Sequence, residues 1–114
     1  MQKIIFRIEI LNVDANFENF LLKNSNMIDL GKGISVFKES NHDEKLKMKI
    51  QINVDETKSY DPSLRNALLS NIIASWLIYN LTGKNIELLI ENNKISLKKN
   101  SLKSCFENLF KNNS

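Results

Sequence analysis

The chain has 114 residues, of which 42% are hydrophobic and 25% charged, and its formal net charge is +3. This composition is typical of one globular domain, and the mild positive charge falls short of the dense basic stripe of a small nucleic-acid-binding domain. The single cysteine excludes an internal disulfide, and no apolar stretch reaches the ~20 residues that span a membrane. We therefore expect a cytoplasmic protein without membrane association, with a single domain over residues 1–111 and a frayed tail over 112–114.

The first half of the chain predicts a strand, a short helix and a β-hairpin. Residues 4–10 alternate apolar and polar side chains, as a half-buried strand does. Asp14 can cap a helix, because apolar residues follow it at helical spacing. These are Phe17, Phe20 and Leu21. Residues 34–54 predict a hairpin with "NHDE" between its strands, and the second strand alternates most regularly. Its apolar residues are Leu46, Met48, Ile50, Ile52 and Val54.

The second half predicts a long helix, a second hairpin and a terminal helix. Asp61 and Pro62 favour a helix start, and the helix is expected to end near Leu81, before Gly83. Its apolar series at a spacing of four is Leu64, Leu68, Ile72 and Trp76, widened by Leu69, Ile73 and Leu77. The strands "IELLI" and "KISL" are expected to be joined by a turn at Asn92 and Asn93. The last helix is expected to begin at Ser101.

This order of elements predicts an α+β fold. The order β-α-β-β-α-β-β-α contains the ferredoxin-like β-α-β-β-α-β arrangement as its core, extended by a β-hairpin strand and a C-terminal helix. In that arrangement the helices cover one face of an antiparallel sheet, and the lysines of the strand at 45–54 lie on the other. The core is then expected to contain the apolar strand residues, the stripe from Leu64 to Leu77, and Phe106.

No pattern in the sequence predicts catalysis. His42 falls in an expected turn and Cys105 in an apolar helical stripe, so we do not expect a Cys–His pair. No residues have metal-ligand spacing, and "GKG" at 31–33 precedes a strand, whereas phosphate-binding loops precede a helix. The expectation is a protein that is not an enzyme and has neither a metal nor a cofactor.

Two sets of residues are candidates for an interaction surface. Lys45, Lys47 and Lys49 project from one side of a strand, about 7 Å apart, and could meet phosphates, an acidic protein or only water. RNA-binding sheets stack bases on exposed aromatic side chains, which this strand lacks on its polar face, so nucleic acid is not the expected partner. Trp76 and Tyr79 could form a hot spot for a protein partner, although a Trp in an apolar helical stripe is more often part of the core.

The order of segments in the second half also carries a family resemblance. From Leu64 to Phe110, a long helix ends in "ASWLIYNLTGKN", the strands "IELLI" and "KISL" flank a polar turn, and "LKSCFENLF" closes the chain with a helix. The opening "IIFRIEI", followed by "NFENFLL", is similar too. This arrangement resembles the small effector-associated constant component domains of bacterial conflict systems. The resemblance implies a non-enzymatic adaptor that couples a separate effector enzyme to its trigger, and it supplies no catalytic residues.

We therefore expect a protein-interaction adaptor whose partner is an effector enzyme or another defence component, with self-association into a homo-oligomer as a further possibility. The alternative is a small phage or bacterial inhibitor or immunity protein that blocks a target, because such proteins are equally small and free of motifs. A second alternative is a nucleic-acid-binding module that uses Lys45, Lys47 and Lys49. Genomic neighbourhood is the cheapest observation that separates these functions.

Overall fold

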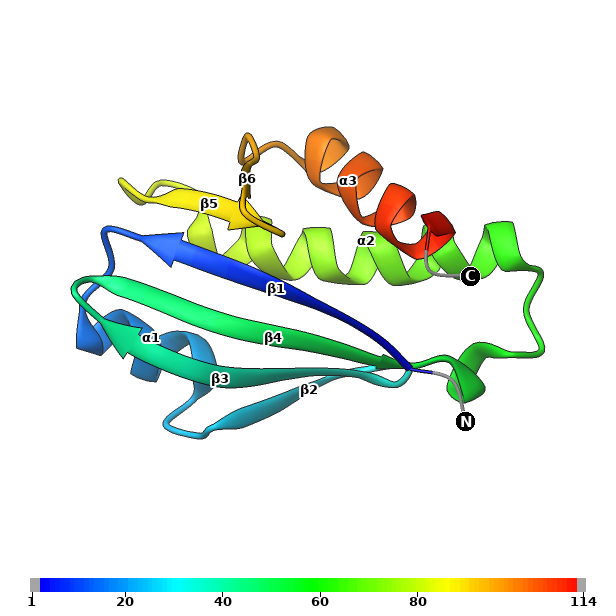
Figure 1. Ribbon diagram of the computed structural model, residues 1–114, viewed down its shortest axis with the longest axis horizontal. Helices are drawn as coiled ribbons and strands as arrows, with labels where there is room; N and C mark the ends of the chain where they lie inside the picture. Colours follow the sequence, from blue (N-terminus) through cyan, green and yellow to red (C-terminus); the bar gives the residue numbers. More distant parts are fainter. Residues whose placement is uncertain (1–2, 113–114) are drawn as a thin grey trace.

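A six-stranded sheet organises the protein in the computed structural model, which describes residues 3–112 (Figure 1). Neighbouring strands are antiparallel, and their order is β2-β3-β4-β1-β5-β6. The first strand of the chain therefore lies inside the sheet. The elements are β1 (Lys3–Leu11), α1 (Ala15–Leu22), β2 (Met27–Gly31), β3 (Ile34–His42), β4 (Lys45–Asn53), the 3₁₀ helix η1 (Val54–Thr57), α2 (Pro62–Leu81), β5 (Glu87–Ile90), β6 (Asn93–Lys94) and α3 (Lys99–Asn112).

The alternation of apolar and polar residues gives the sheet one buried and one open face. β1 and β4 pair in unbroken register, from Lys3 opposite Asn53 to Leu11 opposite Lys45, so their apolar residues fall on the same side. The strand residues that are almost fully buried are Ile4, Phe6, Ile8, Ile10, Ile34, Val36, Leu46, Met48, Ile50, Ile52, Leu88 and Ile90. The regular alternation predicted for β4 is confirmed.

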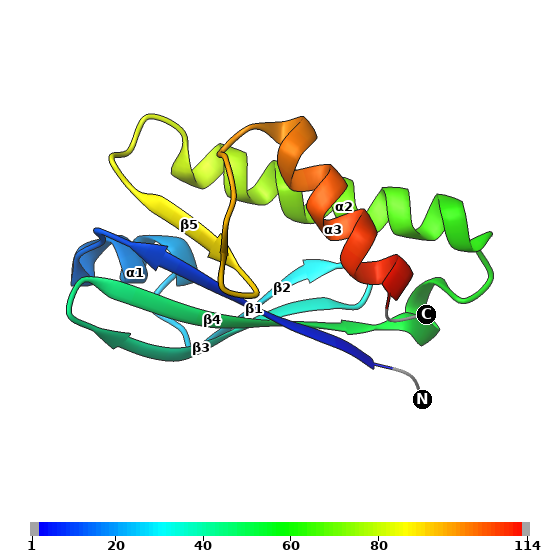
Figure 2. The same cartoon turned by 45° about the horizontal axis from the view of Figure 1, so that its top comes forward.

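The helices pack on the buried face of the sheet. α1 begins at its predicted N-cap, where Asp14 Oδ1 accepts a hydrogen bond of 2.8 Å from the N–H of Phe17. Figure 2 shows α2 running across the sheet with α3 beside it. α3 also reaches the sheet, because the rings of Phe106 and Phe110 lie 5.4 and 6.0 Å from that of Phe6 in β1. These aromatic contacts join α3 to the central strand.

The predicted α+β class and antiparallel sheet are confirmed, but the arrangement differs from the ferredoxin-like one. Three strands, not two, separate α1 from α2, because residues 27–31 form β2. Ile28 and Leu30 of β2 pack against the core. Two alternating apolar residues before a glycine are too short a pattern to separate a strand from a connection. As a result of the extra strand, β1 is antiparallel to both of its neighbours, β4 and β5.

The buried side of α2 matches the predicted stripe in part. Leu69, Ile73 and Leu77, which were predicted to widen the stripe, are fully buried, as is Leu81. Leu64, which opened the predicted stripe, is 66% exposed. α2 carries apolar residues on both sides, so periodicity alone does not decide which side meets the sheet. The predicted limits of α2 are confirmed, although the Asp61 carboxylate makes no capping hydrogen bond and the Asp61 carbonyl accepts from the N–H of Arg65 instead.

The C-terminal part keeps the predicted order of elements, but its last strand is shorter than predicted. β6 covers only Asn93–Lys94, and residues 95–97 of the predicted strand "KISL" are not in a strand. The β5–β6 turn is centred on Glu91 and Asn92, which both have positive φ, one residue earlier than expected. α3 begins at Lys99 and includes Asn112, and residues 113–114 of the predicted tail lie outside the described residues. Over the range 3–112, no helix is long and apolar enough to cross a lipid bilayer.

Candidate interaction surface

The side of the sheet opposite the helices carries a mixture of apolar and charged side chains, and we call it the outer sheet face. Ile5 and Met27 are 43% and 44% exposed there, and Phe37 and Leu89 are half-buried. Their positions follow from the two-residue period of the strands, which turns every second side chain away from the core. The outer sheet face comprises Ile5, Arg7, Glu9, Met27, Phe37, Glu39, Lys47, Lys49 and Leu89.

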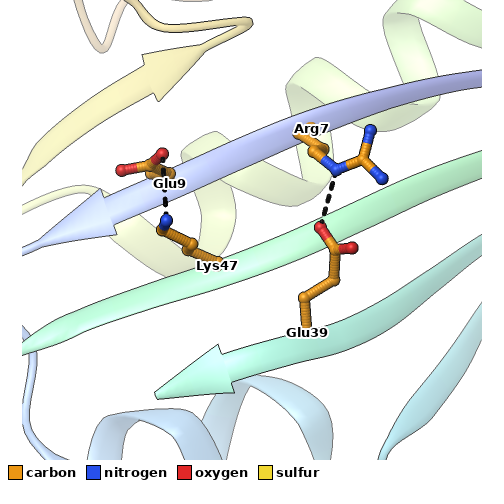
Figure 3. A network of polar contacts seen from close by, with 4 residues as sticks. All are labelled: Arg7, Glu9, Glu39 and Lys47. Carbon is orange, nitrogen blue, oxygen red and sulfur yellow. Dashed lines mark hydrogen bonds and ion pairs between the residues drawn. The ribbon is translucent and has the colours of Figure 1, made fainter. Parts of the chain in front are cut away.

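Charged side chains on the outer sheet face pair with one another (Figure 3). Arg7 Nε donates a hydrogen bond of 3.0 Å to Glu39 Oε1. Lys47 Nζ lies 4.0 Å from Glu9 Oε1, and these two residues face each other across the β1–β4 pair. Cross-strand pairs of opposite charge stabilise a sheet by up to about 1 kcal/mol each. The positive charges of Arg7 and Lys47 are thus balanced within the face itself.

Lys49 has a different partner, the aromatic ring of Phe37. Lys49 lies directly opposite Arg7 in the register, an unfavourable placement for two cations. The two side chains have different partners in β3. Arg7 binds Glu39, and Lys49 Nζ lies 4.9 Å from the centre of the Phe37 ring, a cation–π geometry. Lys45, at the start of β4, is exposed opposite Leu11. The three lysines share one side of β4, as predicted, but two of them have partners in neighbouring strands.

A shallow hollow of about 340 Å³ lies on this face and is lined mainly by charged groups. Three carboxylates surround it, those of Glu9, Glu39 and Glu91, together with only two cationic side chains, Arg7 and Lys47. A phosphate-binding surface needs an excess of positive charge, because its affinity comes from neutralising phosphates. The hollow therefore lacks the excess of positive charge that a phosphate-binding surface needs.

Trp76 and Tyr79, the other candidates, have different environments. Trp76 is half-buried and packs against the core, whereas Tyr79 is 85% exposed. Both belong to α2, which lies across the sheet from Lys45, Lys47 and Lys49. The five candidate residues therefore form two surfaces on opposite sides of the molecule.

His42 and Cys105 lie on separate elements. The His42 Nε2 atom is 3.1 Å from Asp43 Oδ2 in the exposed turn between β3 and β4. Cys105 is half-buried in α3, and burial raises the pKa of its thiol, which lowers the fraction of reactive thiolate at neutral pH. Within residues 3–112, no group of three or more His, Cys, Asp or Glu side chains is placed to hold a metal ion.

A second hollow, of about 660 Å³, lies between the start of α1 and the α2–β5 connection. Lys84 Nζ lies 5.6 and 5.7 Å from the ring centres of Phe17 and Phe20. Phe20 is 59% exposed, although helical spacing predicted it on the apolar side of α1. Sequence reasoning missed this hollow because Lys84 is far from both phenylalanines in the chain. Its lining combines asparagines with aromatic and aliphatic side chains.

Glu18 connects α1 to β3, and its substitution should change the pH dependence of stability. Glu18 is buried, pairs with Lys38 and accepts a hydrogen bond of 2.9 Å from Asn41. Both partners lower the pKa of Glu18 from its ordinary value of 4.5, and Lys38 has the larger effect. The stabilisation is therefore fully present above pH 4.5 and is lost as the pH falls through the lower folded-state pKa. We expect Glu18→Gln to cost about 1 kcal/mol at neutral pH.

Urea unfolding at a series of pH values measures this effect. The difference in unfolding free energy between the parent and Glu18→Gln should shrink as the pH falls below 4.5. Glu44→Gln, in the exposed β3–β4 turn, is the control and should follow the parent at every pH. A difference between the parent and Glu18→Gln that stays constant down to pH 2 would contradict the assigned role of the carboxylate.

The described residues thus offer an uncovered sheet face with two internal ion pairs and an exposed side of α2 around Tyr79. Either can hold another protein through apolar contacts and complementary polar groups. Comparisons with protein-family models, with curated proteins and with solved structures gave no match.

Proposed function

We propose that this protein is a non-enzymatic, cytoplasmic adaptor that binds an effector enzyme, or another component of a bacterial defence system, through its outer sheet face. The observation that carries the proposal is the internal pairing of charge on that face. Two ion pairs, Arg7–Glu39 and Lys47–Glu9, form within the protein itself and need no partner. A partner can therefore cover these two ion pairs without leaving their charges unpaired.

The apolar side chains of the same face support a protein partner. Ile5 and Met27 are more than two-fifths exposed, and Phe37 and Leu89 are partly exposed. Specific protein interfaces combine such apolar patches with a rim of polar and charged groups. The resemblance to effector-associated domains supports an effector enzyme as the partner. An inhibitor or immunity protein could use the same surface, so an activity measurement must separate the two functions.

The test combines this protein with the enzyme encoded beside its gene. The two purified proteins are mixed, and complex formation is measured by calorimetry together with the enzyme's activity before and after its trigger. For an adaptor we expect a complex in which the enzyme can still be activated. An inhibitor would abolish the activity at equal stoichiometry. Absence of both a complex and a change in activity would refute the proposal.

A matched pair of variants locates the interface. Ile5→Glu places a charge on the outer sheet face, and Phe20→Glu places one on α1, at positions that are 43% and 59% exposed. We expect Ile5→Glu to weaken binding at least tenfold, because it buries an unpaired carboxylate in the interface. Phe20→Glu should bind like the parent. Equal effects of the two changes would place the interface elsewhere.

A triple lysine variant tests the nucleic-acid alternative. Replacement of Lys45, Lys47 and Lys49 by glutamine should not change retention on single-stranded DNA or RNA, because two of these lysines already have partners. If the parent binds nucleic acid and the triple variant binds it with a flatter salt dependence, the lysines contact phosphates. That result would favour the alternative function.

A further inference from the structure

The side of α2 that faces away from the sheet is uncharged. α2 has one charged residue among twenty, Arg65, and that side chain is buried. On the outward side, Leu64 and Tyr79 are 66% and 85% exposed. At 3.6 residues per turn, Leu68 and Ser75 fall on the line between them, and both are half-buried. We call this line, with Asn71 and Ile72 at its middle, the outward stripe.

The outward stripe has a symmetric spacing. Leu64 and Tyr79 are equally far along the helix from the midpoint between Asn71 and Ile72, and so are Leu68 and Ser75. If two copies of α2 pair antiparallel with a two-fold axis at this midpoint, each end of the stripe meets the opposite end of the other copy. Leu64 of each copy then contacts Tyr79 of the other copy. The same contact therefore occurs twice, which is the pattern of an isologous interface.

We propose that the protein forms a symmetric homodimer through the outward stripes of two antiparallel α2 helices. A second copy suits this surface because two uncharged stripes meet without burying an ion, whereas a charged partner would leave its own charges unpaired. The long, narrow shape also fits a helix, since the stripe extends about 22 Å from Leu64 to Tyr79.

The available area limits the strength of the dimer. At 85% exposure, Tyr79 alone presents roughly 150–200 Å², since aromatic side chains bury up to about 250 Å². With Leu64 and the flanking residues, two stripes bury on the order of 1,000 Å² in total, near the lower limit for specific interfaces. We therefore expect association at micromolar concentrations.

The dimer extends the proposed function but does not depend on it. α2 lies on the opposite side of the sheet from the outer sheet face, so pairing through α2 leaves that face free in both copies. An adaptor of this form would hold two copies of its partner, which is a route to clustering effector enzymes. If the outer sheet face binds nothing, the dimer is unaffected, and the two proposals fail separately.

Sedimentation equilibrium of the full chain over a range of concentrations tests the dimer. The average mass of the parent should rise from 13.2 kDa toward twice that value. Leu64→Lys and Tyr79→Glu should each keep the protein monomeric, because each buries an unpaired charge against an apolar side chain of the other copy. Tyr60→Glu is the control, an aromatic residue 40% exposed before α2, and should dimerise like the parent.

The double variant with both Leu64→Lys and Tyr79→Glu tests the antiparallel register. The new lysine and the new glutamate are about 22 Å apart within one helix, so they can pair only between copies. We expect the double variant to regain dimerisation, with a salt dependence that the parent lacks. Circular dichroism confirms that each variant is folded, and Leu64→Ser and Tyr79→Ser replace any that is not. A parent that stays monomeric, single variants that dimerise like the parent, or a folded double variant that stays monomeric would each overturn the proposal.

Discussion

Replacement of Phe106 by alanine is expected to destabilise the protein by about 3–5 kcal/mol, the usual cost of removing a fully buried ring. Phe106 has no exposed surface, and its ring lies 5.4 Å from that of Phe6. β5 pairs with Ile8–Leu11 of β1, so α3 packs against the part of β1 that precedes this pairing. Loss of the Phe106 ring should therefore loosen the whole of α3.

Urea unfolding followed by far-UV circular dichroism measures the effect of Phe106→Ala. Phe20→Ala is the matched control, because Phe20 is 59% exposed and its loss should cost less than about 1 kcal/mol. A total stability of about 5–15 kcal/mol is usual for a domain, so Phe106→Ala should remove a large fraction of it. Similar losses for the two variants would mean that α3 contributes little to the core.

Gly33→Ala is expected to be the second most damaging change, at about 3 kcal/mol, from backbone strain combined with steric overlap. Gly33 has a φ of +82°, a conformation that other residues rarely adopt. A Cβ atom there would lie 2.6 Å from the carbonyl oxygen of Asn53 and 2.8 Å from Cγ of Glu56. The Asn53 oxygen belongs to the backbone, and the Gly33 carbonyl accepts a hydrogen bond from the Asn53 N–H at 2.9 Å, so the overlap cannot relax locally.

Gly31→Ala separates the two contributions. Gly31 has a φ of +90°, but a Cβ added there meets no atom within 4 Å. Its replacement should therefore cost only the conformational strain, about 1 kcal/mol. Thermal unfolding of both variants beside the parent measures the difference. If Gly31→Ala and Gly33→Ala lower the melting temperature equally, steric contact with the end of β4 has no part in the effect.

The elements that the sequence predicted well are those set by local patterns. The alternation in β4, the Asp14 cap of α1 and the Pro62 start of α2 depend on residues close together in the chain. β2 was missed because only Ile28 and Leu30 carry its pattern, and it is a strand because it pairs with β3. The side of α2 that is buried was likewise decided by long-range packing.

The candidate surface could be predicted only in part, for the same reason. The side of β4 that carries Lys45, Lys47 and Lys49 follows from the two-residue period of a strand. The partners of these lysines follow from the pairing of β4 with β1 and β3, which brings Glu9 beside Lys47 and Phe37 beside Lys49. Local patterns do not determine that pairing. A row of cations in the sequence is therefore a poor guide to the local charge of a sheet.

The inner position of β1 has a consequence for synthesis on the ribosome. β1 is made first, but its neighbours β4 and β5 and the covering helix α3 come from residues 45–53, 87–90 and 99–112. Translation adds roughly 5–20 residues per second, so α3 is made on the order of 5–20 s after β1. During that time α3 does not cover the apolar side of β1. The β3–β4 hairpin can form earlier, because its strands are adjacent in the chain. The nascent chain therefore depends on this hairpin, or on a chaperone, to shield Ile4, Phe6 and Ile8 until α3 has been made.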